Sequence, residues 1–131
     1  MIIDTHCHLA SAQFDQSRRE AYVEHALREG IDRMITLGAC PDDWEANAAW
    51  ARQFPGVVFC ALGIHPDDAH DAPEGWADRL FRMAQDIPLA AIGETGLDYF
   101  HGAPRGWEAE SFRRLQQDLL EQHFDLAARL G

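Results

Sequence analysis

The sequence predicts an α/β fold built from parallel βα units, and three observations lead to that prediction. Four short apolar runs are each followed by a stretch whose apolar residues have helical spacing, which is the pattern of repeated βα units. These runs are apolar throughout rather than alternating, as is typical of strands covered on both faces. With 131 residues, 47% of them hydrophobic, the chain can form one core, so we expect a single domain over residues 1–131.

Two architectures fit this order of elements. One is an open doubly wound sheet, and the other is half of a (βα)8 barrel, a fold that typically takes about 250 residues for its eight units. The chain finishes in a helical stretch at residues 126–131, where a complete domain would continue into a strand. We therefore expect the N-terminal portion of a larger domain.

Capping signals mark the first unit. An apolar strand opens at Ile2, and Ser17 followed by Glu20 is a capping box that predicts the start of a helix. Gly30 suits the C-terminal cap of that helix. A second strand is predicted over residues 31–38.

The same rhythm continues through the middle of the chain. Pro41, followed by two aspartates, predicts a helix that stops before Pro55. A third strand is predicted over residues 57–63, and Asp71 marks the start of the next helix. A fourth strand is predicted over residues 89–93.

The last helix is predicted over residues 108–130. It carries a stripe of apolar residues at helical spacing: Phe112, Leu115, Leu119, Leu126 and Leu130. The four tryptophans fall in the helical stretches, so we expect them to pack helices onto the sheet: Trp44, Trp50, Trp76 and Trp107.

Composition restricts the classes of function. A net charge of −11 excludes binding of nucleic acid through a diffuse basic surface. Either bound cations supply local positive charge for an anionic substrate, or the substrate is not a nucleic acid. No run of about 18 apolar residues predicts a membrane span, and no secretory signal is evident at the N-terminus. Three cysteines without paired spacing favour reduced thiols and a cytoplasmic protein.

The strongest chemical signal is the pair His6 and His8 at the end of the first strand. Side chains two residues apart in a strand face the same side, so both imidazoles can reach one cation. Barrel enzymes place their chemistry at this carboxyl end of the strands. Metal binding therefore explains the pair better than two unrelated histidines, although the pattern alone names neither the metal nor the reaction.

A carboxylate follows the fourth strand. Glu94 lies between two glycines, which indicate a tight backbone path, and it points to the same end of the sheet as the two histidines. His6, His8 and Glu94 make a minimal three-ligand set with open coordination positions. Asp98 either hydrogen-bonds a ligand from outside this set or caps a turn.

A further histidine, His65, follows the third strand. It faces the same end of the sheet, where it either contacts substrate or is a packed, hydrogen-bonded side chain. The remaining histidines lie on helices or loops without an evident partner in the sequence: His25, His70, His101 and His123.

Three segments, residues 3–9, 62–66 and 92–99, occur in this order and spacing in hydrolases of the TatD deoxyribonuclease family, which the chain therefore resembles. The resemblance covers nearly the whole chain but only the front half of the family's domain. It implies a TIM-like (βα)8 barrel of the metal-dependent hydrolase type, of which residues 1–131 are the N-terminal portion. DNA is the implied substrate, with phosphodiester bonds hydrolysed by metal-activated water.

The resemblance also assigns roles to residues. His6 and His8 would hold one divalent metal, and Glu94 would bridge two metals and act in catalysis, with Mg, Mn or Zn as candidates. His65 would lie near the substrate phosphate or would orient a metal ligand from outside the ligand set. The family's further ligands, two histidines and an aspartate, belong to later strands. At a helix position where the family often has glutamine, this chain has His123.

Two alternatives remain open. A small-molecule metal hydrolase of the amidohydrolase superfamily fits the acidity and the two-histidine pattern, and an inactive truncated fragment fits the ending of the chain. A half barrel leaves apolar edges on its first and fourth strands. We expect self-association, or a separate C-terminal half, to cover them, and no membrane partner.

Overall fold

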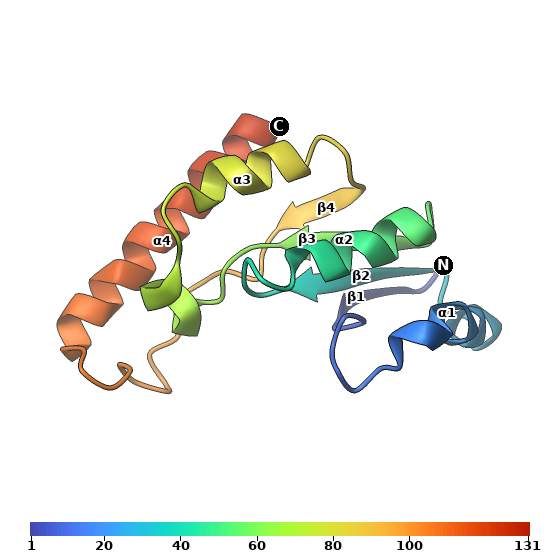
Figure 1. Cartoon of the computed structure of the whole chain (residues 1–131), viewed down its shortest axis with the longest axis horizontal. Coiled ribbons are helices and arrows are strands. Elements are labelled where there is room, and N and C mark those ends of the chain that lie inside the picture. Colours follow the sequence, from blue (N-terminus) through green and yellow to red (C-terminus); the bar gives the residue numbers. More distant parts are fainter.

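The computed structural model describes all residues 1–131 and contains one four-stranded parallel sheet (Figure 1). The strands lie in the order in which they follow one another in the sequence: β1 (Ile3–Cys7), β2 (Arg33–Gly38), β3 (Val58–Leu62) and β4 (Leu89–Ile92). Because the pairing is parallel throughout, the carboxyl ends of the four strands meet at one edge. The order has no reversal, as in a barrel and unlike a doubly wound sheet.

Four helices and two short 3₁₀ helices connect and follow the strands. The α-helices are α1 (Arg19–Arg28), α2 (Trp44–Gln53), α3 (Trp76–Met83) and α4 (Ala109–Leu130). The 3₁₀ helices are η1 (Gln16–Arg18) and η2 (Pro66–Asp71). Helix α2 packs on β2 and β3, and α3 runs alongside α4 (Figure 1). None of these helices combines the length and the apolar character that a membrane crossing needs.

Two apolar clusters hold these layers together. The larger one joins α2, α3 and α4 to β3, and its fully buried members include Trp44, Leu62, Ile64, Leu80 and Leu126. The smaller one lies under α1 and the start of the sheet, and consists of Leu9, Val23, Met34, Trp50 and Val58. The predicted packing of tryptophans is confirmed for Trp44, Trp50 and Trp76, each at most 4% exposed.

The outer strands are more exposed than the sequence predicts. Strands β2 and β3 are largely buried, whereas Ile3 of β1 and both Ala90 and Ala91 of β4 are exposed. The expectation that all four strands are covered on both faces is therefore wrong for β1 and β4. In a closed barrel the inner face is filled by side chains from opposing strands, and residues 1–131 supply four strands.

The first predicted helix start is also wrong in detail. The Asp15 carboxylate accepts hydrogen bonds from both the backbone N–H and the hydroxyl of Ser17, at 2.9 and 2.7 Å. Ser17 therefore lies inside η1 and does not cap a helix at Glu20, and α1 begins at Arg19. A carboxylate is a stronger acceptor than a hydroxyl, so Asp15 takes the capping position.

Of the two later helix starts, the structure confirms the predicted start of α4 and contradicts the predicted start of α3. The last helix begins as predicted, with the Glu108 carboxylate accepting a hydrogen bond from Ser111 N at 2.9 Å. This hydrogen bond, together with those from the Glu110 backbone N–H and the Ser111 hydroxyl, lowers the pKa of Glu108. The third helix does not open at Asp71, because that residue ends η2 and α3 begins only at Trp76. Trp107 precedes α4 and is 41% exposed, so its predicted packing onto the sheet is wrong.

Candidate metal site

Backbone hydrogen bonds and a close backbone contact join the segments at the carboxyl ends of the strands. Gly63 N donates to Gly38 O at 3.1 Å, and Gly93 N donates to Leu62 O at 3.0 Å. A Cβ atom on Gly63 would lie 2.6 Å from the carbonyl oxygen of Glu94, so only glycine allows this close approach. Gly63 therefore lets the segment after β4 lie directly against β3, which sets the position of Glu94.

A buried chain of hydrogen bonds fixes the turn that follows β1. The Thr36 hydroxyl accepts from Leu9 N at 3.1 Å and donates to the Asn47 side-chain oxygen at 2.6 Å. The Asn47 amide group in turn donates to Asp43 O at 3.0 Å. Thr36 and Asn47 are both at most 1% exposed, so these bonds are shielded from water. The backbone immediately after His8 is thereby tied to β2 and α2.

The structure brings together the three predicted metal ligands. One ligand atom each from His6, His8 and Glu94 lie within 4.8 Å of one another. His6 Nε2 is 3.6 Å from Glu94 Oε1, and the His6 and His8 rings are 5.2 Å apart between centroids. Atoms that share a cation at about 2.0–2.2 Å lie about 3.0–3.6 Å apart, so the three side chains need only small movements to share one. Two imidazoles and one carboxylate are a donor set that Zn²⁺, Mn²⁺ and Fe²⁺ accept.

A half-buried aspartate, Asp43, lies near this cluster. The Asp43 carboxylate accepts hydrogen bonds from Ala39 N and Cys40 N, at 3.0 and 3.5 Å. Burial raises the pKa of Asp43, while these hydrogen bonds and the positive charge of a protonated His8 oppose the rise. A cavity of about 270 Å³ lies between them, lined by Ala10, Ser11, Leu37 and Asn47 together with His8 and Asp43.

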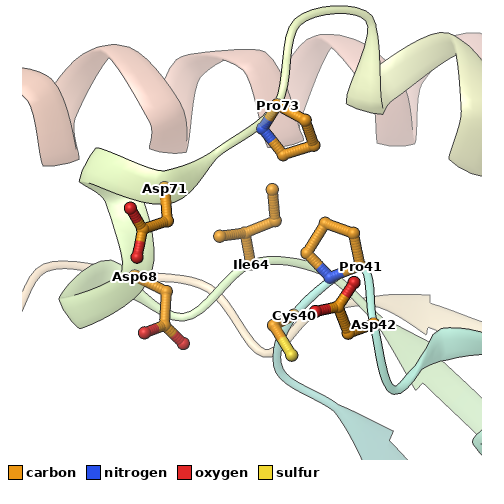
Figure 2. Close-up of a pocket in the computed structure, with 7 residues that line it drawn as sticks. All are labelled: Cys40, Pro41, Asp42, Ile64, Asp68, Asp71 and Pro73. Atoms are coloured by element: carbon orange, nitrogen blue, oxygen red, sulfur yellow. The ribbon is translucent and has the colours of Figure 1, made fainter.

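A separate hollow of about 350 Å³ lies between the β2–α2 loop and η2 (Figure 2). Its lining carries three carboxylates, from Asp42, Asp68 and Asp71, arranged around Ile64. None of the predicted ligands lines it. Three carboxylates disfavour a phosphate there, so we do not assign the chemistry to this hollow.

The structure places His65 and Asp98 in a second group of side chains. His65, Asp67 and Asp98 offer ligand atoms that also lie within 4.8 Å of one another. Asp98 Oδ1 accepts from Phe100 N at 2.8 Å, so the turn-capping reading of Asp98 is confirmed. This bond, followed by the bond from the His101 ring at 3.0 Å, lowers the pKa of Asp98. His65 Nδ1 accepts a hydrogen bond from Asp67 N at 3.2 Å and caps η2.

Helix α4 supplies two buried polar residues that sequence reasoning did not single out as parts of the site. The Gln116 amide pairs with the backbone of Asp98, accepting from its N at 3.0 Å and donating to its O at 2.9 Å. His123 Nε2 accepts from Ile64 N at 3.0 Å, next to His65. Gln116 and His123 are at most 1% exposed, so α4 anchors both segments that carry the second group. The sequence signal that could have identified them is their helical spacing with the apolar residues of α4, which places both on its buried face.

The fold and this site define half of a (βα)8 barrel with a cluster of side chains at its mouth that could hold a metal ion. Residues 3–131 match the family of TatD related DNases, and the chain belongs to that family. The chain aligns over 98 residues, at 33% identity, with the 3'-5' ssDNA/RNA exonuclease TatD of Cronobacter turicensis. That alignment covers 75% of this chain and 36% of the relative. The metal-dependent hydrolase YabD of Bacillus subtilis is 30% identical over 99 residues, 76% of this chain and 38% of YabD.

Solved structures agree with the half-barrel architecture. The TatD homologue YJJV from Escherichia coli K12 superimposes with a TM-score of 0.78 at 28% identity, covering 98% of this chain and 47% of that one. A TatD family hydrolase from Entamoeba histolytica gives a TM-score of 0.75 at 19% identity, covering 98% of this chain and 46% of that one, and shares the fold. The chain thus spans about a third to a half of the proteins that it matches.

Proposed function

We propose that residues 1–131 carry the front half of the active site of a metal-dependent nuclease that hydrolyses DNA phosphodiester bonds. One observation carries the proposal: His6, His8 and Glu94, from opposite edges of the sheet, converge within 4.8 Å. The family and the printed activity of its TatD relatives, a 3'-5' ssDNA/RNA exonuclease, support the substrate class.

Each residue of the cluster has a distinct part in this proposal. His6 and His8 bind a divalent cation through neutral imidazole nitrogens, and Glu94 binds it through its carboxylate, with the Glu94 backbone positioned by the close contact at Gly63. A bound cation would activate water and stabilise the negative charge that develops on the phosphate. It would also supply positive charge that a chain of net charge −11 otherwise lacks near an anionic substrate.

Other sequence predictions stay predictions. In this proposal His6, His8 and Glu94 hold one cation, and the second cation that the resemblance implies, bridged by Glu94, is expected only with the family's further ligands. The substrate contact of His65 is expected from its position at the mouth. A cytoplasmic location is expected from three free cysteines. Self-association, or a C-terminal half, is expected at the open edges of β1 and β4.

Metal binding and DNA hydrolysis test the proposal in two separate steps. Calorimetric titration with Mn²⁺ should show one more bound cation in the wild-type chain than in His6→Ala or Glu94→Gln. His25→Ala, which changes an exposed histidine of α1, should bind as the wild type does. The same number of bound cations in the wild type and in both ligand variants would refute the site.

Hydrolysis of labelled single-stranded DNA with Mg²⁺ or Mn²⁺ follows on the same variants. Cleavage by the wild-type chain that Glu94→Gln abolishes and His25→Ala leaves unchanged is the expected result. An absence of cleavage by a chain that still binds metal would refute nuclease activity for these residues alone. It would leave the metal site intact.

A second candidate is a small-molecule metal hydrolase. The specific observation in its favour is the negative charge at the same end of the sheet, where Asp42, Asp68 and Asp71 line a hollow and would repel a long polyanion. Hydrolysis of a small neutral ester or amide, without DNA cleavage, would select this alternative. The same Glu94→Gln substitution should abolish either activity.

A further inference from the structure

We propose that the second group of side chains, His65, Asp67, Asp98 and His101, is an additional binding site for a divalent cation, with Zn²⁺ as the best fit. The site is separate from the His6, His8 and Glu94 cluster and shares no residue with it. It does not depend on the phosphodiester chemistry proposed above.

The two distances from Asp67 to the histidines fit a shared cation better than they fit hydrogen bonds. Asp67 Oδ2 is 3.7 Å from His65 Nδ1 and 3.5 Å from His101 Nδ1, both at or beyond the limit of a direct hydrogen bond. Asp98 Oδ2 is 3.0 Å from His101 Nδ1. Ligand atoms at about 2.0–2.2 Å from Zn²⁺ lie about 3.0–3.6 Å from one another, which is close to this spacing.

A second observation concerns the other oxygen of the same carboxylate. Asp67 Oδ1 is buried and has no hydrogen-bond partner. A buried, unpartnered carboxylate oxygen destabilises the folded chain unless a cation or donor compensates its charge. A cation bound at Oδ2 would offset the negative charge of the whole Asp67 carboxylate.

The protonation states are also suitable. His65 Nδ1 accepts the hydrogen bond from Asp67 N, so this nitrogen carries the lone pair that a metal ligand needs. A cation would replace that bond, which is long at 3.2 Å. The His101 ring can present Nδ1 as the fourth ligand once its proton resides on Nε2. Two imidazoles and two carboxylates are nitrogen and oxygen donors that suit Zn²⁺ better than Mg²⁺ or Ca²⁺.

The cation would connect two segments that come from different strands. His65 and Asp67 follow β3, whereas Asp98 and His101 lie in the loop between β4 and α4. Gln116 and His123 already fix the backbone on either side, at Asp98 and at Ile64. A site with four protein ligands would be structural, closing the loop of residues 93–108 over the mouth. The predicted influence of His65 on substrate would then act through the charge of the cation.

Zinc titration in a background that lacks the first site tests this proposal by itself. His8→Ala should still bind one equivalent of Zn²⁺, measured by competition with a chromophoric chelator, and adding Asp67→Asn or His101→Ala should remove that equivalent. His8→Ala combined with His25→Ala is the matched control and should retain it. Asp67 and His101 side chains are 37% and 63% exposed, so neither change should unfold the chain, which circular dichroism checks.

A second readout follows the loop. Arg105 is exposed in the loop between β4 and α4, so trypsin should cleave after it. Zn²⁺ should slow that cleavage in His8→Ala and leave it unchanged in His8→Ala/Asp67→Asn. No zinc binding by His8→Ala, or binding that survives both Asp67→Asn and His101→Ala, would overturn the proposal. Either result would leave Mn²⁺ binding by the first site untouched, so the two proposals fail separately.

Discussion

The buried histidine of α4 offers the sharpest test of how this structure is held together. His123 is 1% exposed, its Nε2 accepts from Ile64 N at 3.0 Å, and its Nδ1 donates to Leu119 O at 2.7 Å. Its ring packs on Trp76 at a centroid distance of 4.5 Å. Both nitrogens are therefore used by a neutral imidazole, and a protonated ring would lose the acceptor that Ile64 needs.

Substitution should separate the hydrogen bond from the packing. His123→Leu keeps a side chain of comparable size but leaves the Ile64 N–H buried without a partner, so we expect a loss of about 1–3 kcal/mol in the free energy of unfolding. His123→Gln offers an amide oxygen as an acceptor and should lose less. Urea denaturation monitored by tryptophan fluorescence measures both differences. Equal losses for the two variants would contradict the importance of the Ile64 bond.

The buried His123 side chain also predicts that stability depends on pH, and the sign of that dependence can be worked out. Burial lowers the pKa of His123 below its ordinary value of 6.5. As pH falls through 6.5, the His123 imidazole becomes protonated in the unfolded chain while it stays neutral in the folded chain. The free energy of unfolding therefore decreases. The contribution of His123 is fully present above pH 6.5 and is lost below it, by at most about 1.4 kcal/mol per pH unit for one proton.

His123→Gln should show a shallower decrease between pH 7 and 5.5 than the wild type, since all other titrating groups are shared. Urea denaturation at a series of pH values gives the two slopes. Identical slopes would mean that His123 gains its proton equally in both states, and would refute the buried, neutral imidazole.

Three further substitutions test other parts of the framework. Trp44→Phe removes the indole N–H that donates to Gly63 O at 2.8 Å, and should lower the free energy of unfolding by about 1–3 kcal/mol in urea denaturation; an unchanged midpoint would contradict this. Gly63→Ala places a Cβ 2.6 Å from Glu94 O, so Mn²⁺ binding by calorimetry should weaken or vanish, and full affinity would refute the close-contact argument. Thr36→Val removes the acceptor for Leu9 N, so amide exchange at Leu9 should accelerate, whereas unchanged protection would show that another group holds that turn.

The parts of the fold that are local in sequence could be predicted. The apolar runs give the four strands to within two residues, and the start of α4 follows from Glu108, whose carboxylate caps a backbone only three residues away. Local rules failed where two candidates competed for one role. At the first helix, Asp15 rather than Ser17 provides the cap, because both are capping residues and spacing alone does not rank them.

Long-range partners left no signal in spacing. Gln116 is 18 residues from Asp98, and His123 is 59 residues from Ile64, yet each pair is joined by hydrogen bonds. The helical stripe of α4 places Gln116 and His123 on the buried face, but it does not identify the backbone segment that each side chain contacts. The His65, Asp67, Asp98 and His101 group is equally nonlocal, because the loops after β3 and β4 meet only in the folded chain.

The convergence of His6 with Glu94 is itself a consequence of sheet curvature. β1 and β4 are the two outer strands, with β2 and β3 between them, so in a flat sheet with strands about 4.8 Å apart they would be separated by about 14 Å. Side chains stand perpendicular to a flat sheet, so their tips would stay equally far apart. The observed 3.6 Å between His6 Nε2 and Glu94 Oε1 requires the sheet to curl toward a barrel, with both side chains on the concave side. A cation bound there would join the two edges of the half barrel and would therefore help to hold the curvature that the sheet already has.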